Sequence, residues 1–169
     1  MLSPMVGYAA TALGYIALSK GGPVQVREVA SAVGVPAPYL SKIVHRLSKR
    51  GLLATRRGIG GGVQLAFDPG TFSLHDLCEA LDDPMLRAHC LLGLGTCDDD
   101  VACPAHEFSR RIRAKQLEFL KQTSVLDVGR FDVERQRRGM PRRAARGGTD
   151  ASTPRSKARD GGSKRGGRG

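Results

Sequence analysis

A short amphipathic helix that leads directly into a glycine-rich hairpin constrains the fold of this chain most strongly. Apolar residues recur three or four positions apart at Leu40, Ile43, Val44 and Leu47. This spacing predicts a helix from Tyr39 to Lys49 with one buried face. Gly51 is a typical cap position, and two short strands are predicted at Leu52–Arg56 and Gly62–Phe67. The glycines of residues 57–61 supply the sharp turn between the strands.

The remainder of the chain adds helices and no further sheet. Apolar spacing and cap residues predict them at about residues 4–19, 26–33, 74–81 and 104–122. Ser3 or Pro4 can open the first of these, Gly34 ends the second, and Ser73 is the N-cap of the third. The predicted fold class is therefore mainly α with a small β-wing: a winged helix-turn-helix domain followed by a long C-terminal helix.

In a winged helix-turn-helix, the second helix enters the major groove of DNA with its N-terminal half. Residues near its start would face base edges or phosphates: Tyr39, Ser41 and Lys42. Residues further along would mostly contact phosphates: Arg46, Lys49 and Arg50. For this helix alone, a solvated basic face explains the pattern as well as DNA binding does.

The hairpin after this helix favours DNA binding over a merely solvated basic face. Arg56 and Arg57 stand beside four glycines in five positions, Gly58 and residues 60–62. We interpret these glycines as a place where backbone approaches a ligand closely, because an ordinary hairpin does not need so many. Arg57 at the tip is predicted to enter a narrow minor groove.

Metal-ligand residue types are concentrated in one short segment: Cys90, Cys97, Cys103 and His106. Thiolates on a flexible glycine loop, followed by an imidazole, suit an iron–sulfur cluster or zinc. A thiol switch without metal needs only two of these cysteines, and cysteines without any ligand are a further alternative. Cys78 stands apart and is predicted to be a buried small hydrophobic residue.

The net charge of +11 is unevenly distributed. Residues 133–169 hold 12 Lys/Arg against 3 Asp/Glu, residues 20–57 hold eight against one, and residues 68–107 hold one against nine. A basic segment beside an acidic one can orient the molecule on a polyanion such as DNA. The basic tail either strengthens non-specific DNA binding or is a solubilising disordered extension.

The start of the chain is apolar but carries no basic residue before Lys20, so it does not read as a signal peptide. It is also too short for a comfortable membrane span. We expect a cytoplasmic protein without membrane contact, whose thiols stay reduced. No arrangement of catalytic residues stands out, so an enzyme is not predicted.

Several of these features together resemble one known family. They are Tyr8-Ala9, Val29-Ala30, Tyr39-Leu40, Gly51-Leu52, the Arg57–Gly62 stretch and the three cysteines before the last helix. The chain resembles the winged-helix bacterial regulators of the IscR/NsrR type, the Rrf-two family, over residues 1–130. The resemblance implies a homodimer whose C-terminal helices pair, and a palindromic operator in double-stranded DNA.

The same resemblance implies a regulator, in most members a repressor, whose DNA affinity depends on an iron–sulfur cluster (2Fe–2S or 4Fe–4S) or on thiol state. The signal would be redox state, nitric oxide or iron–sulfur status. It implies the ligand set Cys90, Cys97, Cys103 and His106. It also implies base contacts from the start of the helix at Tyr39, Ser41 and Lys42, and a wing contact from Arg57.

This chain departs from the family pattern at several positions. Six residues separate Cys90 from Cys97, where IscR-type members have five. Gly7 stands where some NsrR-type members have an acidic ligand, which favours His106 as the fourth ligand or a site left open. Ser41 replaces an acid that sets specificity in IscR, so the operator is expected to differ. The basic tail has no family counterpart.

We divide the chain into a DNA-binding domain (residues 1–84), a cysteine-rich cluster-binding loop (85–103), a dimerisation helix with a C-terminal segment (104–132) and a disordered basic tail (133–169). The cysteine-rich loop is expected between the dimer helix and the DNA-reading domain, so that its order changes half-site spacing. Two alternatives remain: a zinc-stabilised winged-helix DNA-binding protein, and a thiol-based module that binds a metabolic enzyme through the acidic residues 68–107.

Overall fold

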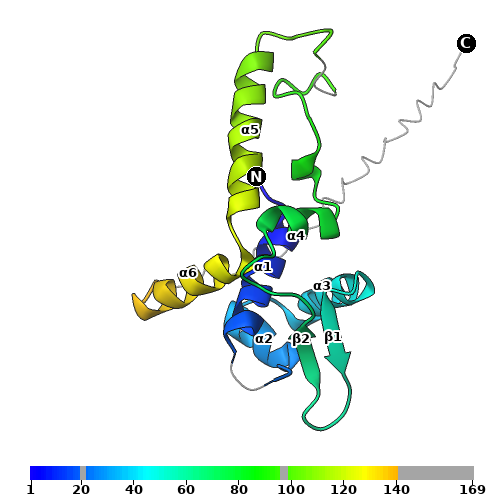
Figure 1. Ribbon diagram of the computed structural model, residues 1–169, viewed down its shortest axis with the longest axis vertical. Coiled ribbons are helices and arrows are strands. Elements are labelled where there is room, and N and C mark those ends of the chain that lie inside the picture. Colours follow the sequence, from blue (N-terminus) through cyan, green and yellow to red (C-terminus); the bar gives the residue numbers. More distant parts are fainter. Residues whose placement is uncertain (20–21, 96–98, 141–169) are drawn as a thin grey trace, which may run out of the picture.

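The computed structural model describes residues 1–19, 22–95 and 99–140. Within these ranges the chain forms six α-helices, one 3-10 helix and one two-stranded antiparallel sheet. In chain order the elements are α1 (Pro4–Leu18), α2 (Val26–Val33), α3 (Ala37–Lys49), β1 (Leu53–Arg56), β2 (Gly62–Leu65), α4 (Leu74–Ala80), η1 (Pro84–Leu86), α5 (His106–Gln122) and α6 (Val125–Arg137). The predicted fold class, mainly α with a small β-wing, is confirmed (Figure 1).

Local signals define where the helices begin and end. The Ser3 hydroxyl accepts from the Val6 N–H at the start of α1, where Pro4 occupies the first turn. Gly34 ends α2 with a left-handed φ of +64°, which glycine adopts without strain. Ser73 caps α4 and forms a reciprocal capping box with Asp76.

The hydrophobic core lies where α1 packs against α2, α3, α4 and the base of the sheet. Its fully buried large side chains are Val6, Leu13, Val29, Leu40, Ile43, Leu47, Val63, Leu77, Val125 and Cys78. Cys78 is thus a buried residue of the core, as predicted, and burial raises the pKa of its thiol to about 11. A second side of α1 is covered by α6.

The helix α6 differs from the sequence prediction. It extends to Arg137, five residues into the segment 133–169 that was expected to be disordered. It crosses α1 so closely that a Cβ on Gly14 would lie 2.7 Å from the backbone N and Cα of Gly129. Residues 125–137 therefore pack against α1 of the predicted DNA-binding domain (residues 1–84). The rest of the predicted tail, residues 141–169, lies outside the described residues.

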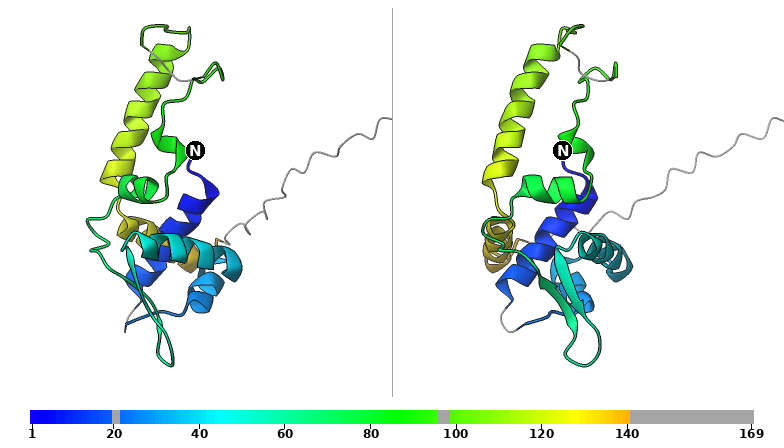
Figure 2. Two further views of the ribbon diagram at one scale, coloured as in Figure 1. Left: turned by 90° about the vertical axis from the view of Figure 1, so that its right-hand side faces the viewer. Right: turned by 45° about the vertical axis from the view of Figure 1, so that its right-hand side comes forward.

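The helix α5 stands away from this core, as Figures 1 and 2 show. The described residues of the cysteine loop (85–95 and 99–103) run beside α5 to its N-terminal end, at the end of the molecule opposite the tip of the β1–β2 hairpin. These described residues lie away from α3, whereas the loop was expected between the dimer helix and the DNA-reading domain. None of the described helices is both long and apolar enough to span a bilayer.

Candidate functional site

The outer face of α3 presents basic side chains to solvent. Leu40, Ile43 and Leu47 turn one side of the helix into the core. This leaves the opposite side to Lys42, His45 and Lys49, all exposed. His45 belongs to the same face, because it lies three positions from Lys42 and four from Lys49.

Two residues near the start of α3 are held in defined positions. The ring of Tyr39 is half-buried and packs edge-on against Tyr8 of α1, with the ring centroids 5.6 Å apart. Such a contact fixes the ring relative to the core. Ser41 is exposed, but its hydroxyl donates to the Ala37 carbonyl at 2.8 Å, so it must rotate to read a base.

The wing (residues 53–65) projects from the end of the molecule opposite the cysteine loop (Figure 1). β1 and β2 pair in a register that sets Arg56 opposite Gly62, and both Arg56 and Arg57 are exposed. These arginines are therefore free to meet a polyanion on this side. The fully exposed Ile59 marks the tip of the turn.

Two of the wing glycines, Gly61 and Gly62, have an intramolecular explanation that our interpretation of a close approach to a ligand did not include. A Cβ on Gly61 would lie 2.3 Å from the Arg56 carbonyl oxygen, and one on Gly62 would lie 2.4 Å from that of Val24. Val24 and Val63 exchange backbone hydrogen bonds of 2.9 and 2.8 Å at this point. Glycine is required here by the fold of the hairpin itself.

Arg46 and Arg50 lie on the flank of α3 that faces the segment after α4. The guanidinium of Arg50 donates to the Asp82 carboxylate at 2.9 Å, and that of Arg46 approaches the same oxygen at 3.8 Å. Arg46 also contacts the Met5 sulfur. Sequence reasoning missed Asp82, because only the folded chain brings it to the C-terminal half of α3.

Two of the predicted metal ligands come together. Cys90 and Cys103 are both half-buried, and their sulfur atoms lie 3.8 Å apart. Backbone N–H groups of Leu94 and Leu92 lower the pKa of the Cys90 thiol, so this turn favours the thiolate. Gly93 and Gly95, with φ of +74° and +113°, give the turn the backbone shape that directs these groups.

The separation of the two sulfurs fits a shared metal ion. Two thiolates on one tetrahedral centre, with metal–sulfur bonds of about 2.3 Å, lie about 3.8 Å apart. The Cys90–Cys103 distance equals this value without any rearrangement. The donor set that the described residues provide is thus compatible with zinc and with an iron of a cluster.

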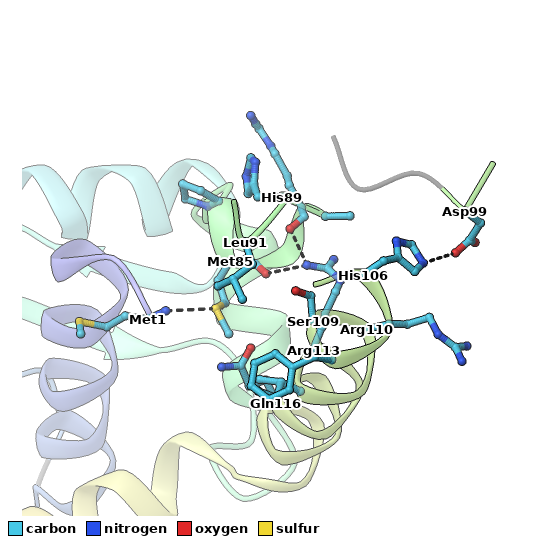
Figure 3. Close-up of a pocket in the computed structure, with 15 residues that line it drawn as sticks. Met1, Met85, His89, Leu91, Asp99, His106, Ser109, Arg110, Arg113 and Gln116 are labelled. Carbon is cyan, nitrogen blue, oxygen red and sulfur yellow. Dashed lines mark hydrogen bonds and ion pairs between the residues drawn. The ribbon is translucent and has the colours of Figure 1, made fainter. Parts of the chain in front are cut away.

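His106 is not assembled with this pair. It begins α5 and is mostly buried, but its Nε2 atom lies 2.8 Å from a carboxylate oxygen of Asp99 (Figure 3). Its ring nitrogens do not lie within 4.8 Å of both sulfurs, and the candidate metal group found among the described residues is instead His75, Asp76 and Glu79. Cys97 lies outside the described residues.

A residue not singled out from the sequence attaches the cysteine loop to α5. Arg113 donates hydrogen bonds to the carbonyl oxygens of Met85 and Arg87, which are drawn in Figure 3, and to that of Leu86. Three carbonyls on one guanidinium fix residues 85–87 against the helix, only three positions before Cys90. The signal in the sequence was weak, since Arg113 is one of several arginines on α5.

Comparison with known proteins now identifies the family. The model of the Rrf2 family, described as iron-dependent transcriptional regulators, matches residues 2–130. This chain belongs to the Rrf2 family. It is 32% identical over 119 residues to the HTH-type transcriptional regulator IscR of Cronobacter sakazakii, covering 70% of this chain and 73% of that protein.

The solved structures agree in fold. The global cysteine regulator CymR of B. subtilis aligns with a TM-score of 0.64 at 23% identity, over 78% of this chain and 97% of CymR. IscR of T. potens aligns with a TM-score of 0.60 at 20% identity, over 85% of this chain and 93% of its own. The chain is accordingly a DNA-binding transcriptional regulator of the Rrf2 family and not an enzyme.

Proposed function

We propose that the chain is a homodimeric transcriptional regulator whose affinity for a palindromic operator is controlled by an iron–sulfur cluster bound in the cysteine loop. The observation that carries the proposal is the Cys90–Cys103 pair, two thiols at metal-sharing distance in a turn that stabilises thiolate. The family's iron dependence and the similarity to IscR support iron over zinc. The signal would be redox state, nitric oxide or iron–sulfur status, and repression is the expected output.

The sulfur distance favours a cluster in which one iron takes two protein ligands. A 2Fe–2S cluster has this arrangement, with two ligands on each iron, whereas each iron of a 4Fe–4S cube takes one. We therefore assign Cys90 and Cys103 to one iron. Cys97 and His106 remain as ligands for the second iron, and His106 would have to leave Asp99 in order to bind.

The dimer would form through α5. Its outward stripe exposes Phe108, Ile112 and Phe119, with 60%, 40% and 59% of their surface accessible. Beside this stripe lies an apolar groove of about 370 Å³, lined in part by Leu2 and Met85. A second copy of α5 matches such a surface, because a two-fold axis sets the same apolar stripe against itself.

The DNA contacts would come from the two basic surfaces already described. Tyr39, Ser41 and Lys42 begin the helix that enters the major groove, and Arg46 and Lys49 follow toward the phosphates. Arg56 and Arg57 reach the neighbouring groove from the wing. The basic tail adds a salt-dependent, sequence-independent contribution, which its removal would reduce without changing operator preference.

The cofactor is tested by purifying the protein without oxygen and measuring iron, zinc and inorganic sulfide beside the visible spectrum. We expect coloured protein with equal amounts of iron and sulfide. Cys90→Ser and Cys103→Ser should lose both, while Cys78→Ala, which removes the thiol buried in the core, should keep them. Colourless protein with one zinc per chain would support a zinc-stabilised DNA-binding protein instead.

DNA binding needs its own experiment. A duplex selected by the protein from a random pool should show a two-fold related sequence, because a symmetric dimer reads two half-sites. Failure to retain any DNA at low salt, together with retention of a metabolic enzyme on immobilised protein, would favour the thiol-based interaction module.

A further inference from the structure

Asp82 occupies an unusual position between the DNA-reading helix and the cysteine loop. It follows α4 with a φ of +55°, the single positive value at a non-glycine position in the described residues. Its carboxylate accepts from Arg50 at 2.9 Å and lies 3.8 Å from Arg46. Arg46 and Arg50 are residues whose chemistry and place on α3 suit them for DNA phosphates.

The neighbouring residue, Asp83, links this position to three separate elements. Asp83 is 3% exposed, and its carboxylate accepts from the Ser3 N–H at 3.1 Å and from the Met85 N–H at 2.8 Å. Its own N–H donates to the Cys78 carbonyl at 2.9 Å. Asp83 thereby connects the start of α1, the end of α4 and the start of η1, and Asp82 is displaced when this junction shifts.

A short segment joins this point to the cysteines, and its first part, residues 83–87, is held by hydrogen bonds. Arg113 of α5 holds the carbonyls of residues 85–87, and Cys90 follows three residues later. A change in the cysteine loop can therefore reach Asp82 through a short segment, of which residues 83–87 are held by hydrogen bonds. Control of DNA binding by the cysteine loop requires such a connection, since the described part of the loop and the wing lie at opposite ends of the molecule (Figure 2).

We propose that Asp82 is an internal competitor of DNA: it neutralises Arg46 and Arg50, and the cysteine loop controls DNA affinity by holding or withdrawing this carboxylate. The inference rests on the proposed DNA contacts of α3 and adds the residue that regulates them. An arginine cannot give its full charge to a phosphate while a carboxylate shares its guanidinium. Both partners are half-exposed, so exchange between Asp82 and a phosphate costs little.

The test is Asp82→Asn, because asparagine accepts a left-handed backbone and removes only the charge. The control is Glu79→Gln, which removes the same charge from the exposed side of α4. Binding to a labelled duplex of mixed sequence is measured as salt rises from about 50 to 200 mM. We expect Asp82→Asn to bind about two- to five-fold more tightly at low salt, the size of effect that breaking an exposed ion pair gives.

The logarithmic salt slope of Asp82→Asn should steepen by about one to two units, as one or two more phosphates are contacted. In an Arg46→Ala/Arg50→Ala background the substitution should have no effect. Binding equal to that of Glu79→Gln would overturn the inference, and so would weaker binding than wild type, since Asp82 would then position the arginines for DNA. If wild type itself binds no DNA, the proposed function fails together with the inference.

The connection to the cysteine loop has a separate readout. Wild-type protein is compared before and after anaerobic removal of its metal with a chelator, and the ratio of the two DNA affinities is measured. The ratio should move toward one in Asp82→Asn and stay unchanged in Glu79→Gln. An undiminished ratio in Asp82→Asn would overturn the part of the inference that makes Asp82 responsive to the loop.

Discussion

The close crossing of α1 and α6 predicts that a glycine-to-alanine substitution in α6 destabilises the protein, although the same substitution usually stabilises a helix. A Cβ added at Gly129 would lie 2.6 Å from the Gly14 carbonyl oxygen and 2.9 Å from its Cα. Carbon contacts are comfortable only at about 3.5 Å and beyond, so the helices would have to separate by nearly 1 Å. Overpacking of this kind costs about 1–3 kcal/mol, more than the 0.5–1 kcal/mol that alanine gains over glycine in a helix.

We therefore expect Gly129→Ala to lower the free energy of unfolding by about 1–2 kcal/mol. The matched control is Gly7→Ala, also within a helix but with open space around it, which should stabilise by about 0.5–1 kcal/mol. Urea unfolding followed by circular dichroism measures both, at one fixed protein concentration because a dimer's stability depends on concentration. Equal stabilisation by both substitutions would refute the close helix crossing.

Three further predictions follow from the same structure. Ile112→Glu should convert the dimer to a folded monomer in sedimentation experiments, whereas an unchanged dimer would exclude the exposed stripe of α5 as the interface. Arg57→Ala and Tyr39→Ala should each lose specific DNA binding while the dimer persists, and normal binding by both would show the groove assignments to be wrong. Hydrogen bonds from Ser124 hold the pKa of Asp127 below its ordinary value; its contribution to stability is therefore complete above the unfolded pKa and is lost as pH falls through the folded one. Asp127→Asn should flatten this acid limb of the stability curve, and an acid limb identical to wild type would contradict it.

The sequence predicted most of the fold where local signals coincide. Gly34 ends α2, Ser73 begins α4, and the spacing of Leu40, Ile43 and Leu47 marks the buried face of α3. Each of these signals acts within a few residues of where it stands. The elements that depend on them were accordingly expected within about two residues of their observed ends.

The helix α6 could not be predicted in the same way. Its buried residues are Val125, Gly129 and Asp132, so two of the three positions that face the core are not apolar. A helix that packs through a glycine leaves no hydrophobic periodicity in the sequence. Its capping box at Ser124 and Asp127 was the available signal.

The candidate site was predictable in composition but not in arrangement. Ligand types and basic residues are visible in the sequence, and the structure brings Cys90 to Cys103. The Asp99–His106 pair and the contact of Asp82 with α3 arise from tertiary packing between separate segments. No spacing rule along the chain encodes such contacts.

The central claim is that metal binding in the cysteine loop changes the DNA affinity of the protein. One pair of DNA-binding titrations tests it most directly. The DNA affinity of anaerobically purified protein for its selected duplex is measured with the metal in place and again after its removal, at constant salt. The account predicts that the two affinities differ by a factor well outside error, and that Cys90→Ser shows one affinity under both treatments. Identical affinities for loaded and stripped wild-type protein would contradict it.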